Sequence, residues 1–265
     1  MFSNIYLNPA NAFIGINASG KTSVLKVLLL ALGIINNEPI NHMNTKDILG
    51  NTKNAILNVY FYSETTKEIC RLETVITSKN TKVEGVVYSI ESESLWSKKA
   101  EEVTTRKAML DFEEREPVIV RDEQESFLSD DVSIMIAYNK KTGEHIKVVS
   151  MLLFTNVNVL PFSEGIPAEV ISYLDPTIEK LNFEEKNEKP IIHLKFKGKE
   201  EIVLNNPIEL NNYLSSGTVK GMITFTLAQE VLKDGGYLIV DEIENHFNKE
   251  IVSTLIRFLY GRKNK

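Results

Sequence analysis

The feature that most constrains the fold of this chain lies near its N-terminus. Residues 15–22 read Gly-Ile-Asn-Ala-Ser-Gly-Lys-Thr and match the pattern G-x-x-x-x-G-K-[ST] at every fixed position. Glycines let the backbone curl so that successive N–H groups point inward at phosphate oxygens, and a following helix adds its positive N-terminal end. Because such a loop joins a strand to a helix, the motif predicts an α/β fold with a mixed or parallel core sheet.

The segments on either side of the loop fit this requirement. Ala12–Ile14 predicts a short strand, preceded by another at Ile5–Leu7, and Thr22–Leu32 predicts a helix. From average residue usage, about one protein of this size in a hundred would match the pattern by chance. The context therefore favours a phosphate loop over a turn that merely caps a helix.

Each part of the loop has a chemical role toward a nucleotide. We expect the phosphates to be bound by Gly15, Asn17, Ala18, Ser19, Gly20, Lys21, Thr22 and Ser23. Lys21 supplies a positive charge to the β- and γ-phosphates, which makes it a candidate catalytic residue, and the Thr22 hydroxyl is a ligand for Mg²⁺. The predicted cofactors are therefore ATP and Mg²⁺.

A second motif lies near the C-terminus, where Tyr237–Val240 is a run of four apolar residues typical of a buried parallel strand. Asp241 and Glu242 follow it directly, and carboxylates in this position can point into the crevice where phosphates sit. We expect Asp241 to hold Mg²⁺ through water and Glu242 to act as the general base on the attacking water. Taken alone, the motif could equally be a strand that ends in surface acids.

The region between the two motifs begins with a predicted antiparallel β subdomain over about 50–95. Asn54–Tyr62, Arg71–Ser78 and Val83–Ser89 alternate apolar and polar residues, as half-buried strands do. Lys79-Asn80 is the expected hairpin turn.

A charged helical insertion is predicted next, over about 97–180, with short helices at Glu169–Leu174 and Ile178–Leu181. Pro190–Phe196 and Glu201–Leu204 then predict two paired strands. The segment over about 205–265 is the most regular, with predicted helices at Gly217–Leu232 and Lys249–Tyr260.

A third motif, Leu214-Ser215-Ser216-Gly217-Thr218, precedes Asp241 by about one helix and one turn. Ser215 or Ser216 is a good N-cap for the helix that begins near Gly217. With this motif the chain resembles the ABC-type ATPase heads, and among them the stand-alone ATP-binding proteins related to the RecF, SMC and OLD nuclease ATPases. The segments GINASGKTS, LSSGT and YLIVDEIENHFN carry the resemblance and cover about a fifth of the chain.

The resemblance implies a single bilobed P-loop NTPase head over residues 1–265 that works as a homodimer. Two such heads meet face to face around ATP, and the signature of one contacts the γ-phosphate held by the other; Ser216 and Gly217 would do so here. Asn245 and Asn248 would fall on the loop that crosses the dimer interface. ATP then joins the heads and hydrolysis releases them, which is a two-state switch.

The sequence departs from the family pattern in two places. The switch histidine of such heads lies on a strand beyond the last predicted helix, and His246 is too close to Asp241 for that role. Gln124 is a weak match for the glutamine that senses Mg²⁺. We therefore expect a chain trimmed at both ends. The alternative function is a nucleotide-binding regulatory or scaffold module with little or no hydrolysis, such as a part of a DNA-repair or phage-defence complex.

Composition excludes several other classes. With 43% hydrophobic and 25% charged residues, the 265-residue chain is globular rather than disordered. A net charge of -6 argues against a broad basic surface for nucleic acid, although a DNA or nuclease partner stays open. One cysteine, no signal peptide and no apolar run of about 20 residues predict a cytoplasmic protein without a membrane partner. The histidines and cysteine show no metal-ligand spacing, and no arginine-rich kinase lid or correctly placed GTPase motif is present.

Overall fold

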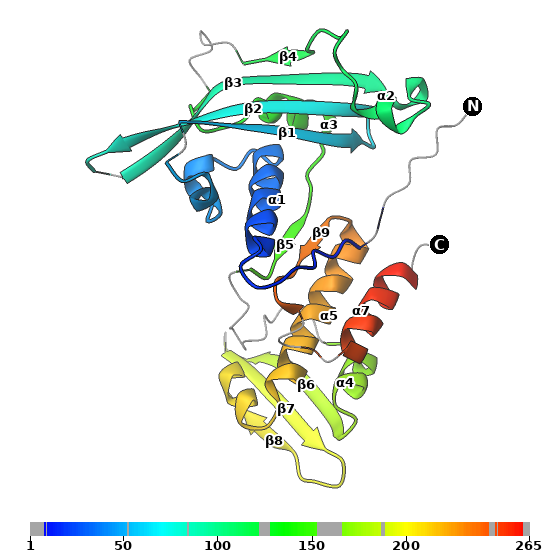
Figure 1. Cartoon of the computed structure of the whole chain (residues 1–265). Helices are drawn as coiled ribbons and strands as arrows, with labels where there is room; N and C mark the ends of the chain where they lie inside the picture. The colour runs from blue at the N-terminus through cyan, green and yellow to red at the C-terminus, as the bar shows by residue number, and fades with distance from the viewer. Residues whose placement is uncertain are drawn as a thin grey trace. The chain divides into compact units, whose positions relative to one another are not determined.

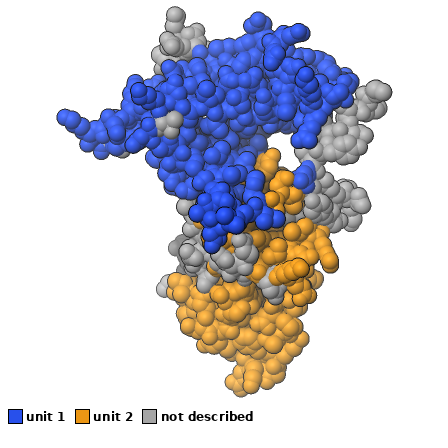
Figure 2. Space-filling view, viewed as in Figure 1, with its two compact units in different colours: residues 1–8, 13–146 blue, residues 9–12, 147–265 orange. Residues whose placement is uncertain are grey.

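A computed structural model of the chain describes residue 8 and residues 10–51, 53–83, 85–121, 128–152, 166–186, 189–243, 247 and 249–261. These residues form a mixed α/β fold with both antiparallel and parallel sheets (Figure 1). The chain divides into two compact units, of which the first holds residues 1–8 and 13–146 and the second holds residues 9–12 and 147–265 (Figure 2).

The first unit is built on a four-stranded antiparallel sheet in the order β1-β2-β3-β4. Its strands are β1 (Asn54–Ser63), β2 (Glu68–Thr81), β3 (Gly85–Lys99) and β4 (Ile119–Val120). Its helices are α1 (Lys21–Ile35), α2 (Arg106–Leu110) and α3 (Met135–Thr142). Three 3-10 turns complete it: η1 (Ile40–His42), η2 (Lys46–Leu49) and η3 (Ala100–Glu102).

One face of this sheet carries the core of the first unit. Alternate residues of a strand point to opposite faces, and in β2 this brings Cys70 and Leu72 to the side on which α1 and α3 pack. The helices contribute Leu30 and Met135, both almost fully buried. Asn139 of α3 also donates from Nδ2 to the Ile35 carbonyl, 2.6 Å away, which fastens α3 to the C-terminal end of α1.

The antiparallel sheet and the first helix are confirmed, whereas two local predictions in the first unit are wrong. The hairpin does not turn at Lys79-Asn80, because β2 runs on to Thr81, which pairs with Gly85. Gly85 has a φ of 74°, a conformation that costs glycine little, and so it favours the later turn. Ala12–Ile14 forms no β pairing, and Ile14 is 95% exposed. The predicted strand at 5–7 lies outside the described residues.

The second unit combines two smaller sheets with three described helices. β5 (Val148–Ser150) and β9 (Tyr237–Ile239) pair in parallel, and β6 (Ile178–Lys186), β7 (Lys189–Phe196) and β8 (Ile202–Leu204) form an antiparallel sheet. The helices are α4 (Ala168–Leu174), α5 (Ser216–Asp234) and α7 (Lys249–Gly261), and η4 spans Pro207–Asn212. The predicted strand pair at 190–204, the helix at 217–232 and the parallel strand at 237–240 are confirmed.

The charged insertion is not the helical segment that its composition predicted. Between residues 97 and 180 the described residues hold three short helices, α2, α3 and α4, interspersed with short strands. Within it, residues 178–181 begin β6 rather than a helix, because Leu181 and Phe183 alternate with exposed Lys180 and Asn182. That period of two belongs to a strand with one buried face.

Helix α5 is the centre of the second unit. Val219, Met222 and Ile223 face the β6-β7-β8 sheet, in a core that also holds Ile192 and Leu194 of β7. Its other side packs on α4 and α7 through Phe225 and Ala228. A helix that is apolar over most of its surface is expected to be buried on several sides, and this explains why α5 is so weakly amphipathic.

Candidate functional site

The residues of the predicted phosphate loop form a tight turn that leads into α1. Ala18 and Gly20 both have positive φ, 61° and 85°, and Gly20 is the N-cap residue of the helix. The Ser19 N–H donates to the Ile16 carbonyl at 3.3 Å, and the Val24 N–H donates to the Gly20 carbonyl at 3.0 Å. Left-handed residues within such a turn aim neighbouring N–H groups toward one point, which is how a backbone makes an anion-binding concavity.

Lys21 reaches back over this loop. Its Nζ donates to the carbonyls of Gly15 and Ile16 at 2.8 and 3.3 Å. The ammonium group is therefore held on the loop itself, although Lys21 is also the first residue of α1. A single flexible cation in this position can exchange its bonds to carbonyl oxygens for stronger ones to phosphate oxygens.

The first residue of the loop lies close to the Ser19 side chain, which would have to rotate to admit a larger residue. A Cβ on Gly15 would lie 2.5 Å from Ser19 Oγ, closer than non-bonded atoms approach. The neighbouring loop residues Asn17, Ser19 and Thr22 are exposed, so the loop presents its polar groups to solvent. The tight turn predicted from the sequence is thus present, whereas phosphate binding by it stays a prediction.

Asp241 and Glu242 follow the parallel strand β9, as the second motif predicted. Asp241 is half-buried and accepts a hydrogen bond at Oδ1 from the Glu242 N–H at 3.0 Å. Glu242 is exposed and has a φ of 50°. Left-handed conformations of residues other than glycine cost of order 1–2 kcal/mol, and such outliers gather at functional sites.

The third motif is an N-cap, as its local sequence predicted. Ser215 Oγ accepts a hydrogen bond from the Thr218 N–H at 3.1 Å and lies 2.8 Å from the Thr218 hydroxyl. Ser216 and Gly217 are the first two residues of α5, and Ser216 is exposed. The backbone N–H groups at this helix start have no partner within the helix ladder, so a phosphate of another molecule could approach them.

The predicted site residues fall into two groups, each described within its own unit. The loop residues Gly15 to Ser23 belong to the first unit, and Ser216, Gly217, Asp241 and Glu242 belong to the second. Gln124, Asn245, His246 and Asn248 lie outside the described residues. The other histidines take no part in these segments: His42 lies in η1, His145 follows α3, and His193 lies in β7.

The donor atoms of Thr22 and Asp241 suit the ion assigned to them. A hydroxyl and a carboxylate are oxygen ligands of the kind that Mg²⁺ prefers, and Mg²⁺ is usually held by one or two carboxylates together with substrate phosphates. Over the described ranges, no three His, Cys, Asp or Glu side chains gather as a metal site. Each of the two side chains has the oxygen chemistry that Mg²⁺ requires, and binding of the ion by them stays a prediction.

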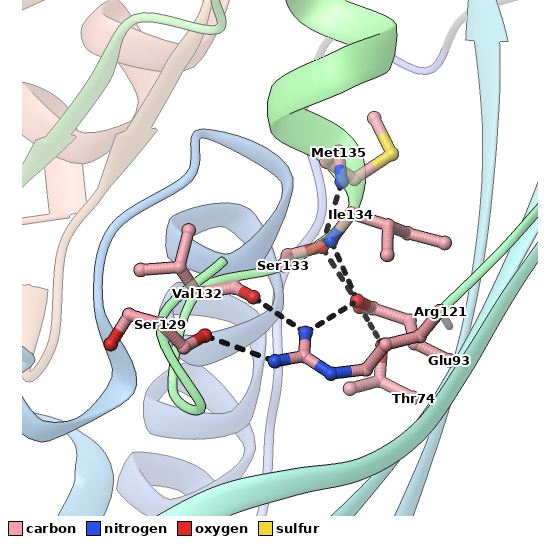
Figure 3. A network of polar contacts seen from close by, with 8 residues as sticks. All are labelled: Thr74, Glu93, Arg121, Ser129, Val132, Ser133, Ile134 and Met135. Atoms are coloured by element: carbon pink, nitrogen blue, oxygen red, sulfur yellow. Dashed lines mark hydrogen bonds and ion pairs between the residues drawn. The ribbon is translucent and has the colours of Figure 1, made fainter. Parts of the chain in front are cut away.

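The most elaborate polar cluster in the first unit surrounds Glu93, a residue that the sequence analysis did not identify (Figure 3). Glu93 Oε1 accepts from the hydroxyls of Thr74 and Ser133 at 2.7 and 2.8 Å. Its Oε2 accepts from the Ile134 N–H at 2.7 Å and lies 4.0 Å from Nη1 of Arg121. The signal that could have revealed Glu93 is its position two residues before Leu95, on the core-facing side of β3.

The contacts of this cluster connect β2, β3 and Arg121, the residue after β4, with the start of α3. Arg121 donates from Nη1 to the Val132 carbonyl at 2.8 Å and from Nη2 to the Ser129 carbonyl at 3.0 Å. Burial raises the pKa of the Glu93 carboxyl above its ordinary 4.5, and its hydrogen bonds and Arg121 only partly offset this effect. Because α3 in turn holds the end of α1, the network supports the helix that follows the phosphate loop.

We expect Glu93→Gln to cost about 1–3 kcal/mol of stability, because the amide offers one acceptor oxygen where the carboxylate offers two to the Thr74 and Ser133 hydroxyls and the Ile134 N–H. A carboxyl with a raised pKa binds its proton more tightly in the folded state, so its contribution to stability falls as pH rises above 4.5. The advantage of wild type over Glu93→Gln should therefore be largest near pH 4.5 and shrink toward neutrality. Urea unfolding across this range measures it, and an advantage that grows with pH would contradict the raised pKa.

No protein-family model, no curated protein and no solved structure matches this chain. Likeness to ABC-type heads therefore rests on the three motifs. Among the helices that the structure describes, none is long and apolar enough to cross a membrane.

Proposed function

We propose that this chain binds Mg²⁺-ATP and hydrolyses it to ADP and phosphate, as a switch coupled to dimerisation of two heads in the cytoplasm. The observation that carries the proposal is the loop before α1. Two left-handed residues, Ala18 and Gly20, turn the backbone directly into a fifteen-residue helix, and the Lys21 ammonium lies over the turn. A left-handed turn, a helix N-terminus and a cation over the turn together suit a triphosphate better than a singly charged anion.

The role that we propose for each residue follows from the chemistry of its side chain. Lys21 would neutralise charge on the β- and γ-phosphates. The Thr22 hydroxyl and the Asp241 carboxylate would hold Mg²⁺, which would supply further positive charge to the phosphates. Glu242 accepts a proton from the attacking water, for which an exposed carboxylate beside the metal-binding aspartate is suited. Ser216 and Gly217, the first two residues of α5, would contact the γ-phosphate bound by a second copy.

The Glu242 backbone gives this assignment some independent support. A φ of 50° is unfavourable for glutamate, and the Asp241 carboxylate stabilises it by accepting from the Glu242 N–H. The Asp241 carboxylate thus stabilises the backbone conformation of Glu242. Strain that is held in place by a neighbouring functional group is expected where a side chain must be aimed at a reacting atom.

The binding step is tested by Lys21→Ala, which removes the cation that faces the phosphates. We expect ATP affinity to fall at least tenfold, since a charge-assisted contact contributes about 1.5–3 kcal/mol. Lys26→Ala is the matched control, because Lys26 lies on the same helix and pairs with Asp47 rather than with the loop. Titration of each variant with a fluorescent ATP analogue measures the effect, and equal affinities in the two variants would refute the loop assignment.

The scaffold alternative makes a different prediction for the same protein. Phosphate release and sedimentation should be measured together with and without Mg²⁺-ATP. Turnover accompanied by ATP-dependent association supports the switch, whereas association that depends on ATP but is not accompanied by turnover favours a scaffold that hydrolyses little or no ATP.

A further inference from the structure

Strand β1 occupies an edge of the first unit's sheet and lacks the protection that edge strands normally carry (Figure 1). It pairs with β2 on one side, and the described residues provide no strand on the other. Unpaired N–H and C=O groups at an edge invite another strand, so natural edges are shortened or interrupted by charge, proline or bulges. β1 runs for ten residues in unbroken register and contains no charged residue and no proline.

The other antiparallel edges in this chain are protected. β4 is two residues long and lies between Val118, which follows Pro117, and Arg121. β8 is three residues long and follows Glu201. β6 carries five charged residues along its length of nine. Among the antiparallel edge strands of the described residues, β1 is therefore the one without such protection.

The outward face of β1 carries two exposed apolar side chains among polar ones. Ile56 is 65% exposed and Tyr60 is 40% exposed, and exposed Asn58 lies between them. The Tyr60 ring centroid lies 6.1 Å from that of Phe112. The alternate residues Leu57 and Val59 pack against the core on the other face. A strand with apolar side chains on both faces and a bare edge gains stability when a further strand joins the sheet.

We propose that β1 pairs antiparallel with β1 of a second copy of this chain, about a two-fold axis at Asn58. This register places Ile56 opposite Tyr60 of the second copy on the outward face. On the core face it places Leu57 opposite Val59 of the second copy. Asn58 then lies opposite itself at the axis, and the two sheets join into one continuous sheet.

Strand β1 is complementary to itself, which favours a second copy of this chain as its partner. A two-fold axis requires each surface to match itself, and in this register apolar residues meet apolar ones while an amide meets an amide. A carboxamide both donates and accepts, so two asparagines can bond to each other. Arg71 Nε donates to Asn58 Oδ1 at 2.9 Å. An amide oxygen has two lone pairs, so this Oδ1 can also accept from the Asn58 amide of the second copy.

Electrostatics also permits the pairing. Each copy has a net charge of -6, which opposes association in general. The paired segment itself is uncharged, so no like charges meet across the axis, where they would be most destabilising. The interface would be distinct from the ATP-dependent one, which uses Ser216 and Gly217 in the other unit.

Sedimentation of the full chain without nucleotide tests this proposal separately from the proposed function. We expect wild type and Lys21→Ala to dimerise equally at up to ~100 µM. Ile56→Lys should weaken the dimer at least tenfold, since lysine is a natural protector of edges. Val120→Lys is the matched control, because Val120 is 54% exposed at the opposite edge of the same sheet. A wild-type monomer, or Ile56→Lys behaving as the control does, would overturn the proposal.

A cysteine cross-link tests the register. Directly opposite residues in antiparallel strands have Cα atoms about 4.5–5.5 Å apart, within reach of a disulfide. Asn58→Cys should therefore form a covalent dimer on mild oxidation, whereas Asn54→Cys should not, since its two copies would be about eight residues apart along the strands. Cys70, the single native cysteine, is buried and does not interfere. Failure of Asn58→Cys to cross-link, or equal cross-linking by Asn54→Cys, would overturn the two-fold at Asn58.

Discussion

Replacing Glu242 by glutamine is expected to leave ATP binding intact and to lower the rate of phosphate release by at least about 10²-fold. General-base catalysis contributes about 10²–10⁴-fold, and glutamine keeps the size and hydrogen-bonding shape of glutamate but cannot accept the proton. Because Asp241 and the phosphate loop are unchanged, affinity for Mg²⁺-ATP should stay within a few-fold of wild type.

The experiment compares three proteins by phosphate release and by nucleotide titration. Glu250→Gln is the control, because Glu250 is also an exposed acid in the same unit, in the first turn of α7. We expect Glu250→Gln to match wild type in both measurements. Unchanged turnover in Glu242→Gln would exclude Glu242 as the base, and weakened binding in that variant would instead place Glu242 among the ligands of Mg²⁺ or ATP.

An alanine at Gly236 should destabilise the second unit by at least about 3 kcal/mol, within the range of large single-site effects. A Cβ at this position would lie 2.2 Å from the Lys147 carbonyl oxygen and 2.9 Å from the Lys147 Cβ. The same carbonyl accepts from the Tyr237 N–H at 2.8 Å at the start of the β5–β9 pair. The φ of 128° at Gly236 adds backbone strain, so the clash cannot be relieved without separating the two strands.

Gly235→Ala provides a matched control for this prediction. Gly235 also has a positive φ, 77°, yet nothing lies within 4 Å of its added Cβ. It should therefore cost only the conformational penalty of about 1–2 kcal/mol. Urea unfolding gives the difference, and hydrogen exchange at residues 148–150 and 237–239 shows whether the parallel pair has opened. Equal destabilisation by the two variants would mean that the approach to Lys147 carries no extra cost.

Glu242→Gln tests the proposed catalytic side chain, and Gly236→Ala tests the strand that positions it. Glu242 and Gly236 flank β9 at opposite ends, so both variants alter the same strand. A loss of turnover with normal stability points to the carboxylate, whereas a loss of both points to the strand that positions it. Together the two variants distinguish loss of the Glu242 carboxylate from displacement of Glu242 by a disrupted β9.

Several parts of the fold followed from the sequence because their signals are local. The helix after Gly20 begins at a residue with left-handed backbone, a conformation that glycine adopts easily. Strand β1 alternates apolar and polar residues along its length, and Ser215 caps α5 through its own side chain. Each of these features depends on residues within one or two turns of each other, and propensity and periodicity capture such features well.

The errors arose where distant residues decide the structure. Ile178–Leu181 was predicted as a helix from its composition, but pairing with β7 makes it a strand. The hairpin turn was predicted at Lys79-Asn80 but lies next to Gly85, because β2 pairs with β3 as far as Thr81. Side-chain packing across strands outweighs intrinsic preference in such segments.

What the sequence by itself determined is a set of local features: a glycine-containing turn before a helix, an acid pair after an apolar strand, and a serine-capped helix. The tertiary structure decided which residues are taken out of water. Glu93 reads as one more acid in a polar stretch, and only folding surrounds it with Thr74, Ser133 and Arg121. The physical reason is that loop and cap conformations are set by neighbouring residues, whereas burial and strand pairing join residues that the sequence keeps far apart.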